Sequence, residues 1–137
     1  MSRVINPDNV GKARTHLTKG VVLAIRELVQ QEEHGIQSRD LAAFIALALD
    51  KISETIDVTV TPWEKRGYWI KADKFRNEWS WTVIYAEDMK RAVLVEDWEG
   101  VIRISWLTAQ KLRKIIVPQG HHLGKPWVGA WNELRRK

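Results

Sequence analysis

Apolar residues recur at helical spacing through the first part of the chain. Over residues 8–32 they step by three and four, and the pattern ends in a polar stretch before Gly35, a residue suited to a helix C-terminus. A broader stripe follows Ser38, which is suited to the N-cap, with Asp40 in the first turn. Two helices are therefore predicted, with core-facing residues Ala13, Leu17, Val21, Ala24 and Leu28 in the first and Leu41, Phe44, Ile45, Ala48, Leu49, Ile52 and Ile56 in the second.

Residues 57–62 give two conflicting signals. The β-branched residues alternate as in a strand, whereas Pro62 is equally suited to the first position of a new helix. We therefore expect a kink or a short break in this segment.

Two further helices are predicted after this break. From Tyr68 to Val93 apolar positions step by four and three without interruption, and a second series begins at Trp98, with Asp97 as its candidate cap. The second series ends before Pro118. The two core-facing seams are Tyr68, Ala72, Phe75, Trp79, Thr82, Ala86, Met89 and Val93, and then Trp98, Ile102, Ser105, Ala109, Leu112 and Ile116.

Four amphipathic helices with short connections predict an all-α fold, an antiparallel four-helix bundle over residues 1–117. Residues 118–137 form a second region, a linker and a basic tail that contains two tryptophans. Within it, the segment from Trp127 to Arg136 is suited to one short amphipathic helix.

The third predicted helix carries a second apolar stripe if it is continuous from Trp63. At ~100° per residue, Trp63, Ile70 and Trp81 lie within about 20° of one another and far from the core-facing seam. A stripe on the outer side of an edge helix indicates a contact with another copy, with a partner or with the folded-back tail. The alternative is that Gly67 ends the helix and resets the phase.

Composition narrows the class of protein. The chain has eight tryptophans and no cysteine. The lack of cysteine excludes disulfides and thiolate metal sites. The net charge is +5, and four of the cations but only one acid lie in residues 118–137, so the tail holds most of the excess. The longest apolar run is far short of the ~20 residues that span a bilayer, and the start lacks an apolar signal core. We expect a cytoplasmic protein without membrane contact.

One part of the chain resembles a known family. The segment from Trp63 to Arg76, continued by Glu78 to Trp81, resembles small helical proteins from filamentous green bacteria of the Chloroflexus type, and the segments Ser2 to Asp8 and Leu41 to Ile45 are similar as well. The resemblance covers residues 1–95. It implies a helical fold across residues 57–67, and it brings no activity, cofactor or site residue.

Motifs of catalysis and metal binding are absent from the sequence. It has no cysteine nucleophile, no His-Glu-x-x-His pair and no Gly-x-Gly-x-x-Gly turn. The Gly120 to Lys125 segment is one residue short of a phosphate loop, and Pro126 stands where Ser or Thr would hold magnesium. His121 and His122 are adjacent but have no third ligand nearby in the sequence. We expect no cofactor and no bound metal, with an enzyme kept as the second alternative.

Two kinds of binding remain. In the first, the protein is a non-enzymatic accessory or scaffold subunit that assembles with itself or docks into a larger protein complex, through interface residues Trp63, Ile70, Trp81, Trp127 and Trp131. In the alternative, exposed tryptophans stack on unpaired bases, and the protein resembles in general character the small basic accessory bundles of reverse-transcriptase or RNA-guided complexes. The candidate nucleic-acid contacts are Lys65, Arg66, Lys71, Lys74, Arg76, Arg103, Lys111, Arg113, Lys114, Lys125, Arg135, Arg136 and Lys137.

Overall fold

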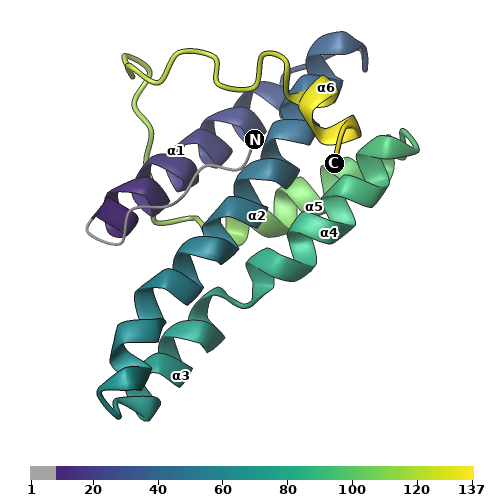
Figure 1. Ribbon diagram of the computed structural model, residues 1–137. Helices are drawn as coiled ribbons and strands as arrows, with labels where there is room; N and C mark the ends of the chain where they lie inside the picture. Colours follow the sequence, from purple (N-terminus) through teal and green to yellow (C-terminus); the bar gives the residue numbers. More distant parts are fainter. Residues whose placement is uncertain (1–8) are drawn as a thin grey trace.

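The computed structural model describes residues 9–137, and this part of the chain is helical without strands (Figure 1). The all-α prediction is confirmed. The segment from Ser2 to Asp8, with the predicted start of the first helix, lies outside the described residues. The helices are α1 (Val10–Val29), α2 (Ile36–Lys65), α3 (Trp69–Trp79), α4 (Trp81–Leu94), α5 (Trp98–Lys111) and α6 (Ala130–Arg135).

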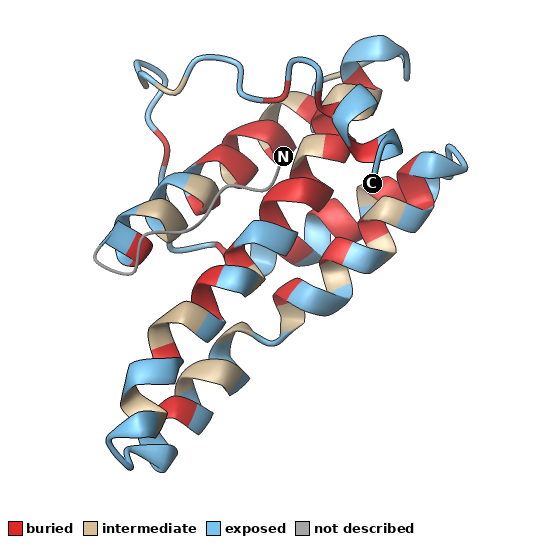
Figure 2. Cartoon of the chain, viewed as in Figure 1, coloured by how far each residue is buried: buried red, intermediate tan, exposed pale blue. Residues whose placement is uncertain are grey.

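The long helix α2 is the centre of the fold. It packs against α1, α3, α4 and α6, while α5 lies mainly against α4 (Figure 1). Figure 2 shows that buried positions concentrate on the first half of α2 and the helices around it, whereas the second half pairs with α3 in a hairpin that projects from this body. The finer prediction of an antiparallel bundle of four helices is not confirmed, because the helices are arranged around α2.

The predicted break at residues 57–62 is wrong, because α2 continues through this segment to Lys65. Two threonine hydroxyls donate to the carbonyl four residues earlier, Thr59 to Thr55 and Thr61 to Asp57, as threonine does inside a helix. Val60 is completely buried, so the β-branched segment contributes to the apolar packing of the helix. Pro62 is accommodated within the final turn of the helix.

The predicted long third helix is also wrong, because the structure divides it into separate elements. Gly67 has a positive φ of 82°, which an L side chain rarely adopts, and it forms part of the turn that reverses the chain between α2 and α3. A second interruption at Ser80 separates α3 from α4. Trp63 therefore lies on α2, whereas Ile70 lies on α3 and Trp81 begins α4.

The predicted core is confirmed in part. Ile45, Leu49 and Ile52 are completely buried, whereas Phe44, Phe75 and Trp79 are half-buried. Tyr68 and Ile116 were predicted to face the core, but both are exposed.

The two predicted caps have different outcomes. Asp97 caps α5 as predicted, since its carboxylate accepts the backbone N–H of Gly100 at 3.0 Å. Ser38 is not the N-cap of α2, because the helix begins two residues earlier at Ile36 and the Ser38 hydroxyl donates to the Glu33 carbonyl instead.

The segment after α5 returns across the molecule and ends on α2 (Figure 1). Trp127, Ala130 and Leu134 are buried in the same apolar core as α1, α2 and α4. In the part of the chain that the structure describes, no helix combines the length and the apolar character needed to cross a bilayer.

Candidate interaction surfaces

A continuous row of aromatic rings links the hairpin to the body. It begins with Trp63 on α2, passes through Phe75 and Trp79 on α3, and ends with Trp81 and Tyr85 on α4. Successive ring centroids are 5.4, 6.5, 6.2 and 5.4 Å apart, within the range of favourable aromatic pairs. The row crosses the Ser80 interruption and ties three helices together.

Arg14 of α1 reaches this aromatic row from the other side of α2. Its guanidinium lies 4.9 Å from the Phe75 ring centroid and 5.8 Å from that of Trp79, and it donates to the hydroxyl of Thr59 at 3.1 Å. Burial lowers the pKa of Arg14 below its ordinary value, while the negative charge of Glu78 opposes this shift. The aromatic faces and the hydroxyl thus compensate a charge that is partly removed from water.

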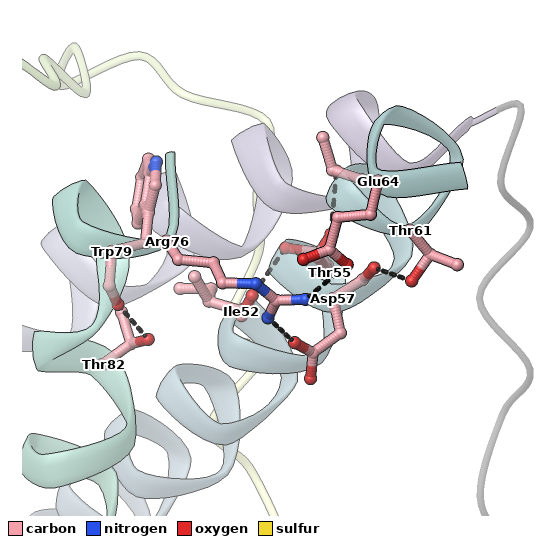
Figure 3. Close-up of polar contacts among 9 residues, drawn as sticks. Ile52, Thr55, Asp57, Thr61, Glu64, Arg76, Trp79 and Thr82 are labelled. Carbon is pink, nitrogen blue, oxygen red and sulfur yellow. Dashed lines mark hydrogen bonds and ion pairs between the residues drawn. The ribbon is translucent and has the colours of Figure 1, made fainter. Parts of the chain in front are cut away.

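Arg76 of α3 forms a second link to α2 (Figure 3). Its guanidinium pairs with Asp57 at 2.5 Å and with Glu64 at 3.1 Å, and hydrogen bonds to these carboxylates raise the pKa of Arg76 above its ordinary value. The pairs lie near the surface, so each contributes modestly to stability. These two ion pairs engage the guanidinium of Arg76, which was one of the predicted nucleic-acid contacts.

The end of the hairpin exposes large apolar side chains, and we call Gly67 to Lys71 the hairpin tip. Tyr68, Trp69 and Ile70 are consecutive and have exposed fractions of 54%, 59% and 79%. The five residues line a shallow surface depression. Burying these side chains against a partner would remove considerable apolar surface from water.

The predicted stripe of Trp63, Ile70 and Trp81 is not formed. Gly67 reverses the chain, so the helical phase on which the stripe depended does not extend from Trp63 to Ile70. Trp63 is half-buried against Phe75 and Trp81 is half-buried in the aromatic row, which leaves Ile70 as the exposed member.

The two tail tryptophans lie on the protein's own body. Trp127 is 4% exposed, and Trp131 is half-buried beneath the guanidinium of Arg39, which is 5.7 Å from the ring centroid. The Asp40 carboxylate accepts the backbone N–H groups of Gly129 and Trp131 at 3.2 and 2.9 Å, which fixes the start of α6 against α2. Trp127 in this arrangement has almost no surface to offer another molecule.

Only Trp69 and Trp106 among the eight tryptophans are exposed, and the sequence prediction selected neither. Trp106 is 62% exposed on α5. The sequence could have indicated the exposure of Trp106, because Trp106 directly follows the core-facing Ser105 and therefore lies about 100° from Ser105 around the helix. Trp69 likewise follows the predicted seam residue Tyr68 directly, about 100° away around the predicted helix.

The predicted basic contacts lie in separate places. Lys71 belongs to the hairpin tip, Lys65 and Arg66 precede it in the sequence and Lys74 follows it; the ammonium group of Lys71 lies 4.2 Å from the Trp63 ring centroid. The cations of α6 lie at the opposite end of the molecule from the hairpin (Figure 1). Apart from Arg76, the predicted basic contacts are all exposed and divide into a hairpin group (Lys65, Arg66, Lys71 and Lys74), an α5 group (Arg103, Lys111, Arg113 and Lys114) and a tail group (Lys125, Arg135, Arg136 and Lys137).

The histidines form local contacts. His121 accepts the backbone N–H of Leu123 through Nδ1 at 3.2 Å, and His34 stacks on Trp98 with ring centroids 4.7 Å apart. Over residues 9–137 no three His, Cys, Asp or Glu side chains are grouped as metal ligands would be.

The resemblance to the Chloroflexus-type family stays a prediction, and it supplies no site residue. Comparisons of this chain with protein-family models, with curated proteins and with solved structures gave no match.

Proposed function

We propose that the protein is a non-enzymatic accessory or scaffold subunit that docks onto a partner protein through the hairpin tip. The observation that carries the proposal is the consecutive exposure of Tyr68, Trp69 and Ile70 at the end of a projecting hairpin. In this proposal α1, α2, α4 and α5 act as an antiparallel four-helix body in the cytoplasm, and the hairpin is its docking arm.

Several contacts support a docking arm that keeps its shape before binding. Arg76 joins α3 to Asp57 and Glu64 of α2, and Arg14 holds α1 against Phe75. An arm that is already ordered loses less conformational entropy on binding than a flexible segment would. The apolar tip is therefore presented at low entropic cost.

The chemistry of the tip favours a protein partner. Ile70 is aliphatic and offers no flat ring for stacking on a base, whereas tyrosine and tryptophan beside it are typical anchors of protein interfaces. The exposed cations Lys65 and Arg66 precede these side chains in the sequence, and Lys74 follows them. Their charge is complementary to an apolar pocket with an acidic rim, either on another protein or on a second copy of this chain.

Site-specific photocrosslinking tests the proposal in cells that make the protein. A benzophenone amino acid at position 69 should give one discrete protein adduct that survives nuclease treatment, and substitution of Ile70 by Ser should reduce its yield. An adduct with twice the mass of the chain would identify the partner as a second copy. The matched control carries the same probe in place of Val128, which is 71% exposed far from the hairpin.

Two outcomes contradict the proposal. One is the lack of any adduct from position 69, or an adduct pattern equal to that from position 128. The other is an adduct that disappears on nuclease treatment, which would place nucleic acid rather than protein at the hairpin tip.

A further inference from the structure

The outward side of α5 carries basic residues around one exposed tryptophan. We call Arg103, Trp106, Gln110 and Lys111, with Arg113 and Lys114 just beyond the helix, the α5 face; all of them are exposed. At ~100° per residue, Trp106, Gln110 and Lys111 lie within about 80° of Arg103 around the axis. The distance along the axis from Arg103 to Lys111 is roughly 12 Å, at about 1.5 Å per residue.

The positive charge of this face is not neutralised nearby in the sequence. Residues 100–132 contain no Asp or Glu. Within residues 9–137, none of the four cations of the α5 face forms an ion pair. Among the acids at the adjoining edge, Asp88 lies 3.6 Å from Arg91 and Asp97 caps α5, while Glu99 is exposed in the first turn, four residues before Arg103.

A groove between α4 and α5 borders the α5 face. Its volume is about 360 Å³, and its lining includes Tyr85, Arg91, Arg103 and Leu107 together with the acids Asp88 and Asp97. Tyr85 is half-buried, and Leu107 is 39% exposed. The groove thus places apolar and aromatic surface next to Arg103 of the α5 face.

We propose that the α5 face binds single-stranded nucleic acid, with the cations contacting phosphates and Trp106 stacking on an unpaired base. Single-stranded nucleic acids are bound by positively charged surfaces with interspersed aromatic platforms, and stacking tolerates any base. A protein partner is less favoured, because Trp106 and Leu107 are the exposed large apolar side chains of α5 and the centre of a protein interface is usually a larger apolar cluster. A bilayer would require a continuous apolar face, which Arg103, Gln110 and Lys111 interrupt.

The other two basic groups differ from the α5 face. At the hairpin, Arg76 is paired and Asp73 lies among the lysines. In the tail, Arg135 lies 5.3 Å from the Trp131 ring centroid, and that ring is half-buried against the body. The hairpin also exposes the rings of Tyr68 and Trp69, but Asp73 lies among its cations, whereas residues 100–132 around Trp106 contain no acid.

Fluorescence anisotropy with a labelled single-stranded oligonucleotide of mixed sequence, titrated from about 50 to about 200 mM salt, tests the proposal. Substituting Lys111 and Arg113 together by Glu should weaken binding about tenfold or more and reduce the slope of log K against log salt by about 1.4, at about 0.7 per lost contact. The matched control substitutes Lys12 and Lys19 of α1 by Glu, which changes net charge equally and should alter affinity less than about threefold.

Substitutions of the tryptophan separate stacking from charge. Trp106→Leu should weaken binding by about 5- to 100-fold, whereas Trp106→Phe should retain most of the affinity. Trp69→Ala should bind the oligonucleotide as the wild type does, so this result is independent of the hairpin proposal. Circular dichroism checks that each exposed-site variant remains helical.

Four results would overturn the assignment of the α5 face. The first is that the wild type does not bind the oligonucleotide at about 50 mM salt, and the second is that the α1 control loses as much affinity as the α5 variant. The third is that Trp106→Leu leaves the affinity unchanged. The fourth is that polyglutamate or anionic lipid vesicles compete as well as an oligonucleotide of the same charge. The last result would identify a general polyanion surface instead of a nucleic-acid site.

Discussion

Arg14 lies with its guanidinium 4.9 Å from the Phe75 ring centroid, a contact that joins α1 to α3 across the central helix α2. Arg14 and Phe75 are far apart in the sequence, and neither is completely buried. The same guanidinium donates to Thr55 and Thr59 of α2. The hairpin that carries the exposed tip is thereby tied to the first helix through both of its own helices.

We predict that Arg14→Met destabilises the protein by about 1–3 kcal/mol. The substitution keeps an unbranched apolar stem but removes a cation–π contact of about 0.5–2 kcal/mol and a hydrogen bond of about 1 kcal/mol. Urea unfolding followed by circular dichroism measures the change in free energy. The control is Lys12→Met, an exposed position on the same helix that should stay within about 0.5 kcal/mol of the wild type. Equal stability of the two variants would show that the Arg14 contact contributes nothing.

A second prediction concerns the turn between α2 and α3. Gly67→Ala should destabilise by about 1 kcal/mol or more, because φ is 82° there and a Cβ at this position would have no atom within 4 Å to compensate by packing. Gly11→Ala should have the opposite sign, since Gly11 lies inside α1 with open space around it and alanine is the better helix former by about 1 kcal/mol. Thermal unfolding of both variants measures the difference, and two shifts in the same direction would contradict it.

The elements that the sequence predicted well are those with a strong local signal. The first half of α2 repeats apolar residues over many turns, and Ile45, Leu49 and Ile52 are buried as that pattern requires. The Asp97 cap was also predictable, because capping depends on residues only three positions apart. Periodicity and capping act within one element, so one sequence is enough to detect them.

The errors arise where distant contacts decide the structure. An unbroken apolar register from Tyr68 to Val93 predicted one helix, yet Ser80 interrupts it. The register was consistent with both arrangements, because α3 and α4 pack on different halves of the same helix α2. Trp127 was predicted as an interface residue for the same reason, since nothing local in the tail indicates that it packs on α2.

A third prediction follows from that packing. Trp127→Ala should destabilise the protein by about 3–5 kcal/mol, the usual cost of deleting a buried large aromatic side chain. Val128→Ala, next to it but 71% exposed, should change stability by less than about 0.5 kcal/mol. Urea unfolding of both variants provides the comparison. If Trp127→Ala were as stable as Val128→Ala, the tail would not be docked in solution.

The last prediction tests the start of α5 with a double-mutant cycle. The three atoms nearest to a Cβ added at Gly100 all belong to the Asp97 carboxylate, so Gly100→Ala should displace that cap. Loss of the cap costs about 0.5–2 kcal/mol, and Asp97→Ala alone should cost a similar amount.

The two substitutions should not be additive. Once Asp97 is alanine, the carboxylate no longer obstructs position 100, and Gly100→Ala should then stabilise the helix by up to about 1 kcal/mol. Gly100→Ala is therefore expected to be destabilising in the wild type and stabilising in the Asp97→Ala background. Measured by urea unfolding of the four proteins, an effect of the same sign and size in both backgrounds would mean that Gly100 is required by another neighbour and not by the cap.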